Sequence, residues 1–427
     1  MEELNRKTID RAVLVGLNAD CFTKEETATE TTLDELEALL NTAGGECAGK
    51  VLQNKHTPDP RSFIGEGKAE EVRQLVLETG ANMVIFDNDL TPSQTRTLED
   101  ILKTTVLDRS ALILDIFAQR AKTAEGRLQV SLAQLKYQSG RLIGQGLVLS
   151  RLAGGIGTRG PGESKLEVNR RRIRERLTDL RRELDEMEKQ RTLRRQSREK
   201  GGVPVVALVG YTNAGKSTLL NAITGAGIPA NDRLFDTLDT TTRLLTVSDT
   251  LDVVISDTVG FIRKLPHQLV EAFKATLEEL EYADLLLHVI DVSNPEWREQ
   301  ARIVDELIRE LGAEGIPCIR VYNKCDVAFT AQQEREKDAV YISARTGEGI
   351  PALLEAVDKR LDKGTKRVVI HLPYDKAGLL DGLYREAKVE GVEYGETVDV
   401  TAVCTPRIMG RLKAYIEGWV EPKEDWE

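Results

Sequence analysis

The sequence has few of the residues that build disulfide frameworks and zinc clusters. It holds five cysteines and four histidines in 427 residues, and these are widely scattered with no C-x-x-C pair. An odd number of dispersed cysteines favours neither a disulfide framework nor a structural zinc site and is typical of a reducing compartment. We therefore expect a cytoplasmic protein.

Long hydrophobic runs are also missing. No apolar stretch approaches the roughly 18 residues that a membrane helix needs, and the amino-terminal residues 1–5 do not resemble a signal peptide. We expect no membrane span. The contents of 41% hydrophobic and 30% charged residues are those of an ordinary globular protein, and the length predicts several domains.

Charge is distributed unevenly along the chain. The formal net charge is -11, yet residues 120–200 contain 21 Lys and Arg against 10 Asp and Glu, which leaves -22 on the rest. A cationic segment in an acidic protein favours a polyanionic partner, most simply nucleic acid. A solvated charged helix is the alternative.

Hydrophobic periodicity predicts a multidomain α/β protein. Residues 1–120 alternate strand-like and helical runs, which indicates a small parallel α/β domain. Residues 201–363 show a second α/β pattern, and residues 364–427 a small α+β domain. The expected strands of the two terminal domains are 12–16, 83–86, 106–107, 368–370 and 397–400, and the expected helices are 33–40, 68–78, 376–388 and 406–418.

Residues 121–200 are predicted to form an antiparallel helical hairpin. Apolar residues repeat with steps of three and four over 128–149 and again over 173–187. Between them, residues 153–163 contain five glycines and one proline, which forbid regular helix. We interpret this segment as a mobile loop at the tip of a basic hairpin, with a plain connector as the alternative. The expected RNA contacts are Arg151, Gly155, Arg159, Lys165, Arg170, Arg171, Arg172 and Arg174.

The strand-like run 205–209 leads directly into a phosphate-binding loop. Residues 210–217 match G-x-x-x-x-G-K-[ST], and a helical segment follows. Glycines at this spacing let backbone N–H groups surround phosphates, and the helix N-terminus adds a favourable dipole. We predict that Lys216 reaches the β- and γ-phosphates and that Ser217 binds Mg²⁺. The predicted nucleotide contacts are Gly210, Tyr211, Thr212, Asn213, Ala214, Gly215, Lys216, Ser217 and Thr218.

A second strand-like run, 251–256, ends in an acidic tetrapeptide of the D-x-x-G type. An aspartate at a strand end beside the phosphate loop is expected to hold Mg²⁺ through water, and the glycine can place its N–H on the γ-phosphate. We predict catalytic roles for Lys216 and Gly260. Nucleotide contacts are expected from Asp257, Thr258, Val259 and Gly260.

Two later strand-like runs, 319–322 and 340–342, end in residues suited to guanine. A carboxylate can accept hydrogen bonds from both N1–H and N2–H₂ of guanine, a pair of donors that adenine lacks. The last segment is expected to offer a backbone contact to guanine O6. Because all these loops follow strand ends at one edge of an open sheet, they predict a GTPase. The residues are Asn323, Lys324, Cys325 and Asp326, followed by Ser343, Ala344 and Arg345.

A threonine between the phosphate loop and Asp257 should contact Mg²⁺ and the γ-phosphate. Thr237, Thr240, Thr241 and Thr242 all lie there. The chemistry of the residues does not choose among them.

The chain resembles the HflX family of translational GTPases. The resemblance rests on residues 210–217, 234–243 and 257–262 and extends to 63–68 and 154–167, so it covers essentially the whole chain. The C-terminal segment is the least distinctive part.

This resemblance implies a switch I element and a partner. Thr237 is then the Mg²⁺ ligand. The family position next to Thr241 is often proline and is Thr240 here, so Thr241 stays an alternative. The resemblance also implies binding to the large (50S) ribosomal subunit and its RNA, ribosome splitting under stress, and a glycine-rich loop directed at the peptidyl-transferase region. We expect a monomer. The implied switch I contacts are Phe235, Asp236, Thr237, Leu238 and Asp239.

The residue that orients the attacking water is not evident. Many small GTPases use a glutamine directly after D-x-x-G, but Phe261 stands there and cannot hydrogen-bond water. We predict slow intrinsic hydrolysis that a partner stimulates. His267 is a candidate for the missing role, and a solvent-exposed bystander is the alternative.

Two other functions fit parts of the sequence. The run Gly65–Lys68 could bind a second phosphate ligand such as ATP, as in a nucleotide-driven RNA remodeller or ribosome-assembly GTPase, or it could be a turn that begins a helix. The basic hairpin could instead dock a protein coiled coil, as in a signalling switch.

Overall fold

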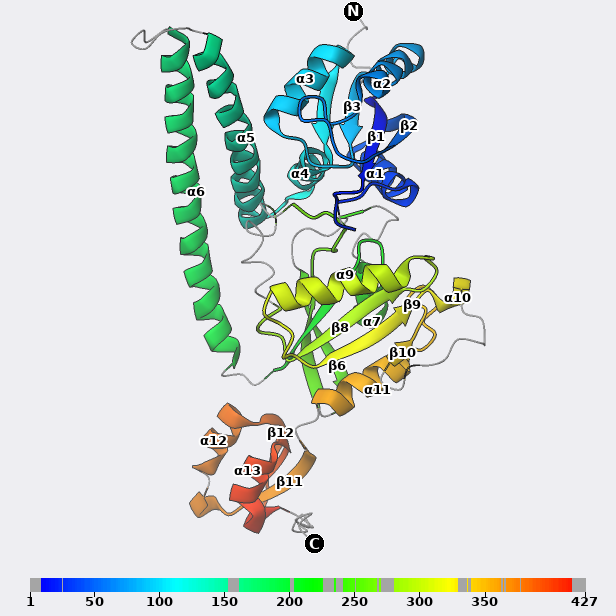
Figure 1. The fold of residues 1–427 in the computed structure, drawn as a ribbon. Coiled ribbons are helices and arrows are strands. Elements are labelled where there is room, and N and C mark those ends of the chain that lie inside the picture. Colours follow the sequence, from blue (N-terminus) through cyan, green and yellow to red (C-terminus); the bar gives the residue numbers. More distant parts are fainter. Residues whose placement is uncertain are drawn as a thin grey trace, which may run out of the picture.

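The computed structural model confirms the α/β multidomain class (Figure 1). None of the helices in the part of the chain that it covers could cross a membrane. The described residues are 9–24, 26–152, 161–199, 203–225, 234–235, 241–249, 251–266, 269, 280–328, 336, 339–361, 364, 366–376 and 378–416.

The N-terminal part is a four-stranded parallel sheet with helices on both faces. The strand order is β2-β1-β3-β4. Alternate residues of β1 point to opposite faces, so Leu14 packs among α1 and α4, whereas Val13 packs among α2 and α3. The bounds are β1 (Arg11–Ala19), α1 (Glu30–Ala43), β2 (Glu46–Lys55), α2 (Glu66–Thr79), β3 (Met83–Phe86), α3 (Pro92–Leu102), β4 (Thr105–Asp108) and α4 (Arg109–Arg120).

The structure contains one N-terminal strand that the sequence did not reveal. The strands expected at 12–16, 83–86 and 106–107 are present, but β2 was not predicted. It lies at the edge of the sheet, and Val51 is its one fully buried residue. An edge strand of this kind lacks the continuous apolar run that marks a buried parallel strand.

Two long helices, α5 (Ala124–Leu152) and α6 (Pro161–Glu199), lie side by side as the predicted hairpin (Figure 1). The expectation that residues 153–163 are all non-helical was wrong at 161–163, because proline is compatible with the first turn of a helix. Along the described part of α6, the heptad positions are the less exposed ones, and Leu180 is fully buried. These positions are Ile173, Leu177, Leu180, Leu184 and Met187. The apolar seam of the hairpin is thus used within the chain.

A six-stranded sheet with order β10-β9-β8-β5-β7-β6 follows, parallel except for β6. Helices α7 and α11 cover one face, and α9 covers the other. All strands expected here are present, whereas β6, β8, α9, α10 and α11 were not predicted. The bounds are β5 (Val205–Gly210), α7 (Lys216–Thr224), β6 (Thr241–Ser248), β7 (Leu251–Asp257), β8 (Leu285–Asp291), α9 (Trp297–Glu310), β9 (Cys318–Asn323), α10 (Cys325–Ala328), β10 (Ala339–Tyr341) and α11 (Ile350–Leu361).

The C-terminal part is a three-stranded antiparallel sheet of order β11-β13-β12 with two short helices. The helix expected over 376–388 covers only 379–386, because the chain turns there into strand β12. Lys388 pairs with Asp252 of the six-stranded unit at 2.5 Å. The bounds are β11 (Lys366–Leu372), α12 (Leu379–Glu386), β12 (Lys388–Tyr394), β13 (Val398–Cys404) and α13 (Pro406–Leu412).

One apolar core runs from the N-terminal unit into the six-stranded unit. Phe117 of α4 packs edge-on against Phe235, with ring centroids 4.6 Å apart, and Phe261 and Ile262 belong to the same cluster. The residues around Phe235 and the segment that contains Phe261 and Ile262 therefore pack on the N-terminal helices.

Candidate nucleotide site

Positive φ angles shape the loop between β5 and α7. Gly210 (φ 156°), Asn213 (φ 61°) and Gly215 (φ 94°) turn the chain from the strand end to the helix start. A Cβ on Gly210 would collide with the Val289 carbonyl, and one on Gly215 with the Asn323 amide. Glycine is required at both positions, and the loop presents successive backbone N–H groups as an anion-binding concavity.

Lys216 is buried at the start of α7. Its Nζ donates to the carbonyls of Gly210 at 3.0 Å and Tyr211 at 2.9 Å, and the residue is 7% exposed. Burial lowers the pKa of Lys216 to about 8, against the opposing effect of the Asp257 carboxylate. A desolvated ammonium at a helix N-terminus is a strong binding group for a phosphate anion.

Ser217 and Asp257 form a pair of oxygens suited to Mg²⁺. The Ser217 hydroxyl donates to Asp257 Oδ2 at 2.8 Å, and Asp257 is fully buried at the end of β7. Mg²⁺ prefers oxygen ligands and usually keeps several waters, so few protein oxygens bind it directly. The donor types fit the ion, because the Ser217 hydroxyl could bind it directly and the neighbouring Asp257 carboxylate could accept from a metal-bound water.

The D-x-x-G segment is hydrogen-bonded to the phosphate loop. The Thr212 N–H donates to the Phe261 carbonyl at 2.7 Å, and the Phe261 N–H donates to the Gly210 carbonyl at 3.2 Å. Thr258 Oγ1 donates to the Leu208 carbonyl at 2.6 Å. The side chain of Phe261 is 2% exposed and belongs to the apolar core.

Asn323 joins the two predicted base-recognition segments to the phosphate loop. Its Nδ2 donates to the Ala214 carbonyl at 2.8 Å, and its Oδ1 accepts from the Ala344 N–H at 2.9 Å. Lys324 pairs with Asp291 at 2.6 Å. Asp326 is exposed, as a group that recognises a ligand edge must be.

The structure brings most of the predicted site residues to one edge of the sheet. β5, β7, β9 and β10 are parallel, so their carboxyl ends meet there. Ser343 and Ala344 are buried at the end of β10, and Arg345 is exposed. Several predicted residues lie outside the described residues: Gly155, Arg159, Asp236, Thr237, Leu238, Asp239, Thr240 and His267.

Sequence reasoning missed a network that joins the two parallel sheets. The Tyr211 hydroxyl donates to Glu35 of α1 at 3.0 Å and accepts from the Arg263 N–H at 2.9 Å. Burial raises the pKa of Tyr211 well above its usual value, with a further contribution from Glu35. No local pattern could have indicated this contact, because Tyr211 and Glu35 are far apart in the sequence.

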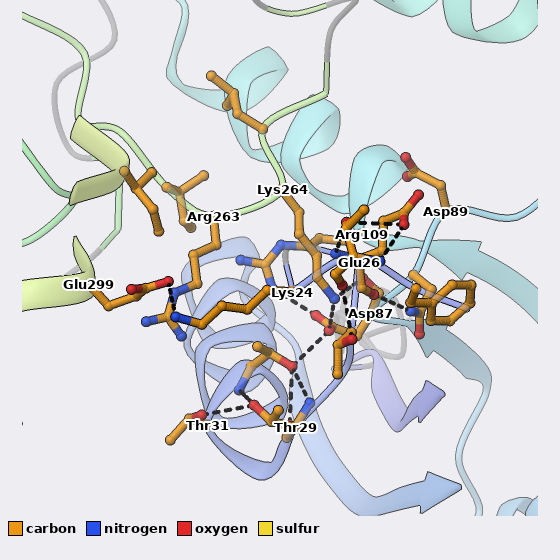
Figure 2. A pocket seen from close by; sticks show the side chains of 18 of the residues that line it. Lys24, Glu26, Thr29, Thr31, Asp87, Asp89, Arg109, Arg263, Lys264 and Glu299 are labelled. Atoms are coloured by element: carbon orange, nitrogen blue, oxygen red, sulfur yellow. Dashed lines mark hydrogen bonds and ion pairs between the residues drawn. The ribbon is translucent and has the colours of Figure 1, made fainter. Parts of the chain in front are cut away.

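A second part of this network centres on Asp87, which follows β3 and is fully buried. Asp87 pairs with Arg109 at 2.8 Å and with Lys264 at 2.5 Å (Figure 2). Arg109 also pairs with Glu35. Burial opposes its ionisation, but Arg109 and Lys264 hold the pKa of Asp87 below its usual value. Lys264 comes shortly after the D-x-x-G segment, so its ion pair with Asp87 links that segment to the N-terminal unit.

Asp87, Arg109 and Lys264 line a cavity of about 770 Å³ between the two units. Lys24 of the N-terminal unit pairs across it with Glu299 of α9 at 3.1 Å (Figure 2). Arg263 pairs with Glu296 at 2.9 Å. Cations and carboxylates of both units line the cavity, and several of them pair with one another.

The predicted basic face of the hairpin is present on α6. Six of its arginines are exposed, and three of them lie within 4 Å of a carboxylate on the same helix. Arg170 is half-buried. The side chains of Arg151 and Lys165 lie outside the described part of the hairpin. The exposed residues are Arg171, Arg172, Arg174, Arg176, Arg181 and Arg182.

Four family descriptions match the chain in succession. They are GTP-binding GTPase N-terminal (residues 30–118), GTP-binding GTPase middle region (120–198), 50S ribosome-binding GTPase (205–324) and HflX C-terminal domain (328–408). Together they span most of the sequence.

Two curated relatives, both GTPase HflX proteins, agree with these matches. GTPase HflX of Caldanaerobacter subterraneus subsp. tengcongensis is 48% identical over 97% of this chain and 96% of its own length. GTPase HflX of Escherichia coli is 45% identical over 89% of this chain and 90% of its own. A solved structure of a GTP-binding protein from Sulfolobus solfataricus in complex with GDP covers 82% of this chain and 98% of that chain, with 22% identity and a TM-score of 0.43. The chain belongs to the HflX family of GTPases, enzymes that hydrolyse GTP.

Proposed function

We propose that this GTPase binds the large ribosomal subunit in its GTP state and separates ribosomes into subunits. The observation that carries the proposal is the exposed arginine face of α6, on a hairpin that extends beside the GTPase unit (Figure 1). Arginine-rich surfaces bind RNA through phosphates. The match of residues 205–324 to the family described as 50S ribosome-binding GTPase supports the same partner.

GTP binds at the edge formed by the strand ends. The loop N–H groups and Lys216 hold the β- and γ-phosphates, and Asp326 accepts hydrogen bonds from guanine. Ser217 binds Mg²⁺ directly and Asp257 through water, with Thr237 of switch I as the further protein ligand implied by the family. When bound, the ion neutralises charge that develops on the phosphates.

Nucleotide-dependent ordering of the switches controls ribosome binding. The D-x-x-G segment is linked to the phosphate loop by Thr212 and to the N-terminal unit by Lys264. A γ-phosphate that attracts the Gly260 N–H competes with these contacts. GTP binding therefore changes how the N-terminal unit and its hairpin are held, and hydrolysis reverses the change.

The main test compares GTP turnover alone with turnover in the presence of 50S subunits or 70S ribosomes at matched salt. Subunit separation is followed on sucrose gradients in GTP and GDP. We expect strong stimulation and GTP-dependent splitting. Unstimulated turnover without ribosome binding would leave the GTPase intact and refute this partner.

Two variants separate the hairpin from the enzyme. Replacing Arg171, Arg172 and Arg174 with alanine should weaken ribosome binding and flatten its salt dependence, because fewer counterions are released. Replacing residues 154–162 with a short rigid linker should abolish splitting. GTP binding by both variants should match the wild type. Splitting at the wild-type rate by the linker variant would remove the loop from the mechanism.

The structure gives no support to the two rival functions. Gly65 is the N-cap of α2, its N–H donates to Gln53 at 3.0 Å, and Lys68 pairs with Glu71 at 2.6 Å. These contacts favour the interpretation of the run 65–68 as a turn that begins a helix. A protein coiled coil could not use the heptad seam of α6, because α5 lies along that helix.

A further inference from the structure

The Thr212 hydroxyl is buried in the phosphate-binding loop without a hydrogen-bond partner. The residue is 6% exposed, and its Oγ1 contacts no donor or acceptor among the residues that the structure describes. Leaving a buried hydroxyl unpaired costs about 1–3 kcal/mol, and most buried polar side-chain atoms are paired. A hydroxyl kept at this cost inside a nucleotide loop points to a partner that arrives with the substrate.

Thr212 lies where the loop meets the D-x-x-G segment. A Cβ built on Gly260 would lie 2.9 Å from Thr212 Cγ2, 3.0 Å from Thr212 Cα and 3.1 Å from Lys216 Nζ. The methyl group and Cα of Thr212 and the Lys216 ammonium therefore all lie beside Gly260. Because Lys216 and Gly260 are the groups assigned to the γ-phosphate, this position marks the γ-phosphate end of the site.

Phe261, the residue after Gly260, cannot orient the attacking water. The Phe261 side chain is apolar and 2% exposed in the core. Its N–H and carbonyl are already bonded to Gly210 and Thr212. A hydroxyl, in contrast, can accept one hydrogen bond and donate another. Thr212 thus carries the chemistry that the Phe261 position lacks.

We propose that Thr212 is a catalytic residue that orients the attacking water, a role which rests on the proposed assignment of residues 210–217 to the triphosphate. Its Oγ1 accepts a hydrogen bond from the water and donates one to a γ-phosphate oxygen. The water oxygen bonds to the γ-phosphorus, and the bond to the β–γ bridging oxygen breaks with its electron pair left on GDP. One water proton stays on inorganic phosphate and the other passes to solvent, so Thr212 itself is unchanged.

The experiment compares Thr212→Val with Thr212→Ser in the full-length protein. Valine keeps the shape of threonine without the hydroxyl, whereas serine keeps the hydroxyl without the methyl group. Single-turnover phosphate release at saturating GTP gives the hydrolysis rate, and fluorescent GDP and GTP analogues give the affinities. We expect Thr212→Val to lose at least about 10-fold in rate, or ~1.4 kcal/mol. Thr212→Ser should keep most of the rate, and both variants should keep nucleotide affinity within a few-fold.

Two reference variants make the result decisive. Thr224→Val removes a hydroxyl that bonds the Leu220 carbonyl on α7 at 2.6 Å, away from the phosphate loop, and should hydrolyse GTP normally. Wild-type turnover by Thr212→Val overturns the proposal. Equal losses of hydrolysis rate in the serine and valine variants also overturn it, because Thr212 would then act through its packing against Gly260 and not through its hydroxyl. If Lys216→Ala still bound GTP as tightly as the wild type, the site assignment would fail instead.

Discussion

The two parallel sheets face each other with the carboxyl ends of their strands, but they use polar groups there in opposite ways. In the N-terminal sheet the groups after β3 are satisfied within the protein. Asn88 bonds the backbone of Leu17 and of Glu26, and Asp87 has two cationic partners. In the GTPase sheet, the loop after β5 holds Lys216 with a lowered pKa and Thr212 with an unpaired hydroxyl.

The difference teaches where a ligand is expected. Where the buried charges at a sheet edge are paired within the protein, few groups remain to bind a ligand. Removing one of these charges leaves its partner buried and unpaired. An edge that keeps a desolvated cation and an unsatisfied hydroxyl is less stable than it could be, which is typical of a functional site. Sheet topology alone does not separate the two edges.

The largest effect should come from breaking the matched edge. Arg109→Ala removes the buried partner that Asp87 and Glu35 share, so the free energy of unfolding should fall by about 3–5 kcal/mol. Denaturant unfolding of the full chain measures this loss. Arg61→Ala, an exposed arginine in the same unit, should unfold like the wild type. A wild-type unfolding curve for Arg109→Ala would show that this network is dispensable.

The reverse pattern is expected at the GTPase edge. Lys216→Ala should weaken GTP binding on the order of 100-fold, about 2.7 kcal/mol, because a buried charge-assisted contact is lost. The nucleotide-free variant should be at least as heat-stable as the wild type, because a desolvated ammonium has been removed. Titration with a fluorescent nucleotide and thermal melting measure the two properties. If Lys216→Ala were less stable than the wild type but bound GTP normally, Lys216 would serve folding and not the ligand, and the contrast between the two edges would be wrong.

The lowered pKa of Lys216 predicts a smaller, pH-dependent effect. Between pH 8 and about 10.4, the usual lysine pKa, the unfolded chain holds the Lys216 proton and the folded chain does not. The contribution of Lys216 to the free energy of unfolding of the nucleotide-free protein therefore rises with pH across this window and is constant below it.

Phosphate binding needs the charged lysine, so the affinity for GTP should fall above pH 8 by up to ~10-fold per pH unit. Nucleotide titrations at several pH values measure this slope. Lys216→Ala provides the control, because it keeps the titration of the nucleotide itself. Equal slopes in the wild type and Lys216→Ala would exclude Lys216 as the titrating group.

The smallest effect should come from Lys68→Ala in the matched sheet. Lys68 pairs with Glu71 at the start of α2, and a partly exposed pair of this kind contributes little. Nucleotide stoichiometry, GTP turnover and ribosome splitting should all equal those of the wild type. Loss of a second bound nucleotide in this variant would show that the run 65–68 is a phosphate site after all.

Sequence reasoning succeeded where the signal is local. The strand that leads into Gly210 and the strand that ends at Asp257 were both identified, because a buried parallel strand is an apolar run followed by its loop residues. The heptad positions of α6 were right for a similar reason, since a seam repeats along one helix. Edge strands β2 and β12 were missed because their burial is irregular. The central strand β8 was also missed, although it is a buried apolar run of the same kind as the strands that were identified.

The amino-acid sequence by itself determined the family and the α/β class, and it predicted the residues of the phosphate and guanine segments. These properties depend on residues close together in the chain, where spacing fixes geometry. Only the tertiary structure decided that Tyr211 meets Glu35, that Asp87 holds Lys264, and that Thr212 is left without a partner. Such contacts join residues far apart in the sequence or depend on what surrounds a buried atom, and both arise only when the two sheets pack together.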